Sequence, residues 1–180
     1  MRRTRFYVLV TGAMALMLAG ASFAVADDGD DDDKGSFKKT RAGMLHGYNE
    51  VPAVSSPGSG TFTAEIDADA QKITFDLRYS GLQATAVAAH IHFAQTDVNG
   101  GVVAFLCGGG GKPVCPASGT VTGTVVPADV GAGAAAQGIA AGEFAELVAA
   151  IRAGRAYVNV HSTTFPGGEI RAQLRGKHKR

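Results

Sequence analysis

Hydrophobic and polar side chains alternate over several stretches of the chain, with the period of two that places one face of a strand against a core. In residues 61–66 every second side chain from Phe62 is apolar, and residues 72–79 repeat the pattern from Ile73. The intervening residues 67–71 contain two aspartates and suit a turn. We predict that the two runs form an antiparallel hairpin.

Turn residues separate further runs whose composition is typical of strands, at 87–93, 102–106, 119–126, 156–161 and 169–174. Many short strands with glycine-rich turns predict an all-β domain, built as an antiparallel sandwich or barrel. We expect its core to include the inward positions Phe75, Leu77, Ile91, Val158 and Val160.

One segment has helical rather than strand-like spacing. Between residues 143 and 153, Phe144, Leu147 and Ile151 recur three or four positions apart, and Gly154 supplies a stop. We predict one short amphipathic helix there, just before the C-terminal hairpin. The preceding residues 130–142 are almost all Gly and Ala, and we expect a loose surface connection.

The first 26 residues have the order of a secretory signal. Three arginines precede an apolar stretch at 7–19, and small residues ending at Ala26 suit signal peptidase, so we predict cleavage after Ala26. A retained membrane anchor is the less favoured alternative, because the apolar stretch is short for a span. The expected location is therefore secreted or periplasmic, with no membrane span after cleavage.

Cleavage leaves a chain of one-domain size. An acidic run opens residues 27–39, which we expect to form a disordered linker rather than a calcium loop. The domain is expected over 40–175, followed by a basic tail at 176–180. Since the signal contains three arginines and no acidic residue, the mature chain has 14 basic and 16 acidic residues, which gives no indication of a nucleic-acid partner.

Cys107 and Cys115 are the only cysteines, and they flank a Gly/Pro-rich loop. In an oxidising compartment such a pair is typical of a loop-closing disulfide. A two-thiolate metal site is the alternative, but the loop contains no histidine to complete it.

Five sequence motifs occur in an order that resembles the CHRD (chordin) domain: Gly47-Tyr48-Asn49-Glu50-Val51-Pro52, Ala89-His90-Ile91-His92, Asn99-Gly100-Gly101-Val102-Val103, Tyr157-Val158-Asn159-Val160-His161-Ser162 and Pro166-Gly167-Gly168-Glu169-Ile170-Arg171-Ala172-Gln173-Leu174. The likeness covers about residues 40–175, with small departures at Asn49 and Ser162. It implies an extracellular, immunoglobulin-like β architecture, and it brings no catalytic reaction with it.

The histidines of two of these motifs are candidate metal ligands. His90 and His92 lie two apart on a predicted strand, so both imidazoles leave the same face. On the strand 156–161, Tyr157, Asn159 and His161 share a face, which allows His161 to approach the pair. Glu169, which opens the returning strand, could add a carboxylate, and such a set suits zinc or copper.

These polar groups also have a structural interpretation, in which the imidazoles hydrogen-bond to backbone carbonyls, Asn159 or Glu169 and fix the last hairpin. Glu169 and Arg171 would then form a charge-assisted network. Glu50 and Pro52 are expected at the entry of an early edge strand, and neither Glu50 nor His46 has strong support as a ligand.

Enzymatic chemistry is not indicated by any motif. The paired histidines are similar to those of copper/zinc superoxide dismutases, but the remaining histidines of that family are missing. The chain also lacks a Gly-x-Ser-x-Gly nucleophile motif, and its run of four glycines lacks the lysine and hydroxyl placement of a phosphate loop.

We therefore expect an exported binding or interaction module, not an enzyme, that presents a patch to an unidentified protein or envelope component. The patch comprises His90, His92, His161 and Glu169, oriented by Tyr157 and Asn159. No cofactor is expected from the resemblance. The alternative hypothesis is a periplasmic protein that binds copper or zinc through His90, His92 and His161.

Overall fold

The computed structural model describes residues 38–176. The predicted signal peptide, the linker as far as residue 37 and residues 177–180 lie outside this part of the chain. Within it the strands are β1 (Lys38–Ala42), β2 (Leu45–His46), β3 (Ser59–Asp67), β4 (Lys72–Ser80), β5 (Ala86–Phe93), β6 (Gly101–Cys107), β7 (Gly119–Val125), β8 (Ala156–Ser162) and β9 (Ile170–Gly176). The helical elements are the short 3-10 helices η1 (Gly47–Asn49), η2 (Pro127–Asp129) and η3 (Ala132–Gln137) and the α-helix α1 (Phe144–Arg152).

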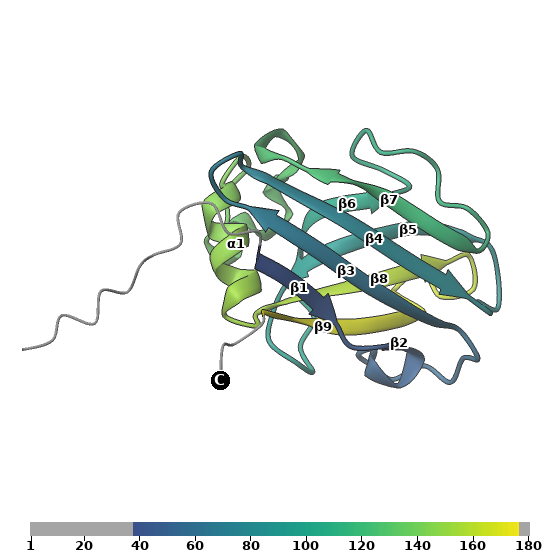
Figure 1. Cartoon of the computed structure of the whole chain (residues 1–180). Coiled ribbons are helices and arrows are strands. Elements are labelled where there is room, and N and C mark those ends of the chain that lie inside the picture. The colour runs from purple at the N-terminus through teal and green to yellow at the C-terminus, as the bar shows by residue number, and fades with distance from the viewer. Residues whose placement is uncertain (1–37, 177–180) are drawn as a thin grey trace, which may run out of the picture. The chain divides into compact units, whose positions relative to one another are not determined.

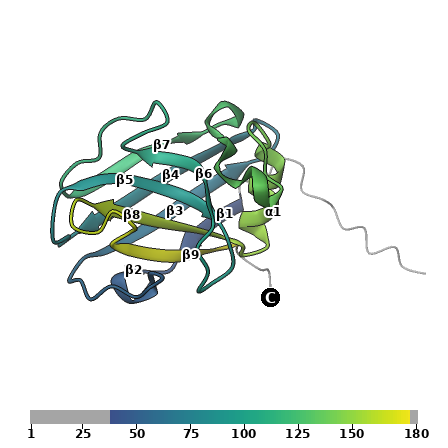
Figure 2. The same cartoon turned by 180° about the vertical axis from the view of Figure 1, so that it is seen from behind.

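All strands of the described region belong to one antiparallel sheet in the order β6-β5-β8-β9-β1-β3-β4-β7, with β2 paired to both β3 and β9. The sheet curls over itself: β1, β3, β4 and β7 form the near layer in Figure 1, and β5, β6, β8 and β9 form the near layer when the molecule is seen from behind in Figure 2. The predicted fold class, an all-β antiparallel sandwich or barrel, is confirmed as a nearly closed, barrel-like sheet.

The alternating pattern sets which residues line the interior of this sheet. In the β3–β4 hairpin, Phe62 lies opposite Leu77 and Ala64 opposite Phe75. The Asp67 carboxylate accepts a hydrogen bond from the Ala70 amide within the turn. The hairpin is confirmed, and so is the expected core, since all five predicted positions are buried: Phe75, Leu77, Ile91, Val158 and Val160.

The predicted helix is confirmed as α1, which packs against β8 and β9 and lies at one end of the sheet (Figure 1). The segment before it is mostly exposed, as predicted, but it is not loose: η3 packs on β6 and buries Ala134, and Ile139, just after η3, also joins the core. Its small residues make this possible. A Cβ at Gly133 would lie 2.3 Å from the Val102 carbonyl oxygen, so the Gly/Ala composition reflects close backbone packing.

The N-terminal part of the domain also differs from the prediction. Strand β1 begins at Lys38, inside the predicted linker, because it pairs with both β3 and β9. The edge strand expected near Glu50 and Pro52 was wrong: the chain turns there instead. The amides of Glu50 and Val54 both donate to the Gly47 carbonyl, and this turn carries the Glu50 side chain into the protein.

Cys107 and Cys115 form a disulfide, as predicted. It closes the loop after β6, in which the Gly108 amide donates to the Pro113 carbonyl. Both cysteines are buried and belong to the hydrophobic core. Between residues 38 and 176, none of the helices has the length and apolar character that crossing a bilayer requires.

Candidate metal centre

The three candidate histidines lie on neighbouring strands of the sheet. His90 and His92 are on β5 and His161 is on β8, and the register places Asn159 of β8 opposite His90. Because side chains alternate along each strand, these polar groups share one face, while Ile91 of β5 is in the hydrophobic core. The predicted convergence of the two strands is therefore present.

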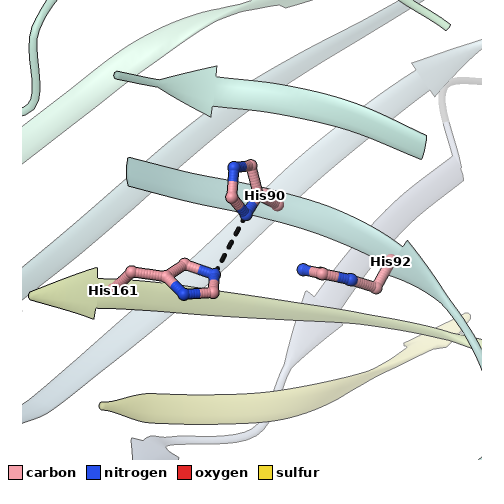
Figure 3. A group of neighbouring side chains, drawn as sticks. All are labelled: His90, His92 and His161. Carbon is pink, nitrogen blue, oxygen red and sulfur yellow. Dashed lines mark hydrogen bonds between the residues drawn. The ribbon is translucent and has the colours of Figure 1, made fainter. Parts of the chain in front are cut away.

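One ring nitrogen from each histidine reaches a common point. The three nitrogens lie within 4.8 Å of one another, and His90 Nδ1 lies 3.0 Å from His161 Nε2. Figure 3 shows the ring of His92 directed toward the gap beside the other two rings. Ligand nitrogens of a tetrahedral zinc ion stand about 3.3 Å apart, given zinc–nitrogen bonds of about 2.0–2.1 Å. Small side-chain movements would bring the set to this spacing.

Backbone carbonyls fix the orientation of two of these rings. His92 Nδ1 donates to the Gly100 carbonyl at 2.9 Å, and His161 Nδ1 donates to the Pro166 carbonyl at 2.9 Å. A neutral imidazole carries a single N–H, so both Nε2 atoms present lone pairs. Metal-ligating histidines almost always have this arrangement, in which the far N–H is held by a carbonyl or carboxylate.

Burial keeps the three imidazoles neutral. Each histidine is at most 8 % exposed. Burial, with a smaller effect of the neighbouring His161 and His92, lowers the pKa of His90 to about 3. Burial likewise lowers the pKa of His92 to about 4, against the opposing effect of its bond to Gly100, and lowers the pKa of His161. Neutral imidazole is the form that binds a metal ion.

Aromatic and cationic groups pack around the histidines. The Tyr157 ring stacks on His92 at 4.6 Å with an interplanar angle of 4°, and the Arg171 guanidinium lies 3.3 Å from the centre of the Tyr157 ring. Phe105 meets His90 edge to face at 4.4 Å. Tyr157 therefore packs flat against the ring of His92; its orienting role stays a prediction.

Two further polar residues, Asn159 and Glu50, belong to the same cluster as the histidines. Asn159 Oδ1 lies 3.0 Å from His161 Nε2. Glu50 is buried, and burial raises its pKa to about 7 despite the opposing effects of Arg171 and of a hydrogen bond with Asn159. Glu50 was not a strong candidate from the sequence. Its place in the Gly-Tyr-Asn-Glu-Val-Pro motif was the available signal, and strand periodicity gave none.

Glu169 is not brought together with the histidines in the metal-ligand cluster. Its carboxylate Oε1 accepts hydrogen bonds from Ser56 Oγ at 2.5 Å and from the Gln83 amide at 2.7 Å. The side chain is fully buried, so these contacts tie the segment before β9 to two other loops. His46 is exposed on β2.

Hydrogen bonds within the protein do not use every polar atom of this histidine cluster. The one proton of His90 is used between His90 Nδ1 and His161 Nε2, and the Nε2 atoms of His90 and His92 are buried without a hydrogen-bond partner. Each unsatisfied buried acceptor costs about 1–3 kcal/mol. A cation bound between the three rings would use the lone pair of His92 and that of His161, which is the chemistry the donor set fits.

Comparison with known proteins gives one match. The model of the CHRD domain family matches residues 42–174, which includes both histidine strands, Glu50 and the disulfide loop. Searches of curated proteins and of solved structures each gave no match.

Proposed function

The chain belongs to the CHRD domain family, and from that premise we propose that it is an exported, non-catalytic binding module that holds a transition-metal ion at His90, His92 and His161. The ion is zinc or copper, the metals that imidazole sites commonly take. The domain would then be a metal-binding protein of the cell envelope or of the extracellular medium.

The observation that carries this proposal is the lone-pair geometry of the three rings. Their ligand nitrogens lie within 4.8 Å of one another, and carbonyls hold the far nitrogens of His92 and His161. Each of the three histidines is at most 8 % exposed. They are therefore too buried to contact a partner protein, whereas a small ion could reach their ring nitrogens.

Export is proposed from three observations that agree. The first 26 residues have the order of a secretory signal, the family is of extracellular type, and the domain contains a disulfide. Reduced cytosolic conditions would not favour such a bond. Detection of the processed chain, beginning at Asp27, outside the cytoplasm would test this part of the proposal.

Metal content of variants tests the proposed site. We expect the purified protein to bind one zinc or copper ion per chain, and His90→Ala or His161→Ala to lower the affinity at least 100-fold, because two nitrogen ligands do not hold the ion as three do. Elemental analysis and a competitive chelator titration measure this, with His46→Ala as the matched control on an exposed histidine.

Thermal unfolding of each metal-free variant shows whether it still folds. An unaltered metal affinity in the folded His90→Ala and His161→Ala variants, or a wild-type protein without metal at micromolar supply, would overturn the proposed function.

A partner-binding surface is a second candidate, favoured by exposed apolar side chains in η1 and just before β2. Met44 is 56 % exposed and Tyr48 is 73 % exposed. Large exposed aromatic residues are enriched at protein interfaces. A photo-crosslinking residue at position 48 should capture a defined envelope protein that the same residue at position 146, on an exposed face of α1, does not capture.

A further inference from the structure

Asn159 faces the same point as the three imidazoles. Its Oδ1 lies 3.0 Å from His161 Nε2, and its side chain is close enough to His92 to act on the pKa of that ring. The N–H of His161 is used at Pro166. No proton of His161 therefore lies between its Nε2 and Asn159 Oδ1, so two lone pairs face each other at short range. A cation placed among these atoms turns a repulsive contact into ligation.

Resting on the metal site proposed above, we propose that Asn159 Oδ1 is the fourth ligand and that Glu50, behind the amide, supplies the counter-charge for a divalent ion. The centre is then a closed, four-coordinate site of three nitrogens and one oxygen. Structural metal sites are closed in this way, whereas catalytic sites keep one position for water or substrate. This coordination agrees with a non-catalytic protein.

Gly168 allows Glu50 and Asn159 to meet. It precedes β9 with a φ of +125°, and an added Cβ would come within 2.5 Å of Glu50 Oε1 and 2.8 Å of Asn159 Nδ2. The Glu50 carboxyl and the Asn159 NH₂ group therefore both lie next to Gly168. With Nδ2 turned toward Glu50, the carbonyl end of the amide is directed at the histidines.

Charge balance gives Glu50 its role. Three neutral imidazoles bring no negative charge to a divalent ion, and Arg171 adds a positive charge nearby. A buried cation without a counter-ion carries a large desolvation cost. The groups that act on Glu50 are Arg171 of β9, Asn159 of β8 and the Val51 backbone. Tyr157 of β8 also interacts with Glu50.

The orphan atoms of this region support the same assignment. Glu50 Oε1 is buried and has no hydrogen-bond partner, which marks a carboxyl that is not neutralised by a direct ion pair. The other buried carboxyl, Glu169, also has an unpartnered oxygen, Oε2, but its Oε1 is held by Ser56 and Gln83. Glu50 is the carboxyl that hydrogen-bonds with Asn159, whose Oδ1 contacts His161.

This arrangement predicts which ions the site prefers. A carboxamide oxygen is a hard ligand, and a nearby carboxylate favours higher cation charge, so the centre should prefer zinc or cobalt(II) to copper(I). A site of three imidazoles alone would lack both features.

Cobalt(II) substitution tests the fourth ligand. We expect the visible spectrum of the cobalt-loaded protein to be that of a four-coordinate ion and to stay unchanged when azide is added, because no position is open. Asn159→Ala should open the position to water and make the spectrum respond to azide. Asn159→Asp, which retains an oxygen ligand, should restore the azide-insensitive spectrum.

Isosteric removal of the carboxylate tests the counter-charge. Glu50→Gln should lower zinc affinity about 10–100-fold, the usual effect of a lost outer-sphere partner, and should lower copper(I) affinity by less. Glu146→Gln, on an exposed position of α1, is the matched control. A merely structural role for Glu50 would weaken both ions alike, and metal-free unfolding curves show that the variants fold.

The outcomes separate this inference from the proposed function. If the wild-type protein binds neither zinc nor cobalt, the metal site itself is overturned. If it binds them but azide shifts the wild-type cobalt spectrum, or if Glu50→Gln binds zinc as the wild type does, the histidine site stands and the roles of Asn159 or Glu50 are overturned.

Discussion

At the scale of single residues, the protein buries ionisable groups and leaves some of their polar atoms without partners. His90 and His92 each retain a ring nitrogen with no hydrogen bond, and Glu50 retains a carboxyl oxygen. Glu169 also retains one, Oε2. Native proteins contain few such atoms, and strain, a functional role or a bound water or ion explains those that persist. Of these atoms His92 Nε2 is the one that an ion between the three rings would use directly.

The same groups make stability depend on pH in opposite directions. The pKa of His90 falls from 6.5 to about 3 on folding and that of His92 to about 4, so their contribution to stability is fully present above pH 6.5 and is lost as the pH falls toward these values. The pKa of Glu50 rises from 4.5 to about 7, so its contribution is fully present below pH 4.5 and is lost as the pH rises through 7.

Glu50→Gln should therefore steepen the rise of stability with pH between 4.5 and 7, by at most about 1.4 kcal/mol per pH unit. Urea unfolding of the metal-free protein at several pH values measures the slope, with Glu146→Gln as control. A slope equal to that of the wild type would contradict a buried, proton-bearing Glu50.

At the scale of elements, two strands and the loops above them make the site. The period-two pattern was sufficient to predict that His90, His92 and His161 share a face, because a strand fixes the direction of its side chains. It did not predict the groups that come from loops. Glu50 enters through the turn at η1, and the carbonyls of Gly100 and Pro166 enter from the connections after β5 and β8. The positions of loop residues depend on tertiary packing, and no repeating pattern in the sequence indicates them.

The disulfide loop is the element whose stabilisation can be measured by itself. Cys107 and Cys115 are eight residues apart, and closing a loop of this size stabilises a folded chain by about 2.5 kcal/mol in the chain-entropy description. We expect the double variant Cys107→Ser/Cys115→Ser to lose about this much, plus the cost of two buried hydroxyls. Denaturant unfolding of the wild type with and without reductant gives the matched comparison, and equal stability of both forms would contradict this estimate.

At the scale of the whole molecule, the fold class could be predicted because short alternating strands and one helical segment are local signals. Strand order could not, since it depends on long-range pairing: β1, at the start of the described chain, completes the sheet between β9 and β3. The Gly/Ala segment before α1 was expected to be a loose surface connection; it is mostly exposed but ordered, since η3 packs on β6, where small residues let the backbones approach. The family match extends over nearly all of the described chain, residues 42–174.

Anomalous diffraction at the zinc absorption edge, from crystals grown with zinc, shows whether the three histidines hold the ion. We predict a single strong peak about 2.1 Å from His90 Nδ1, His92 Nε2 and His161 Nε2. A zinc-soaked crystal with no peak between these three rings, or with zinc bound only elsewhere on the protein, would contradict it.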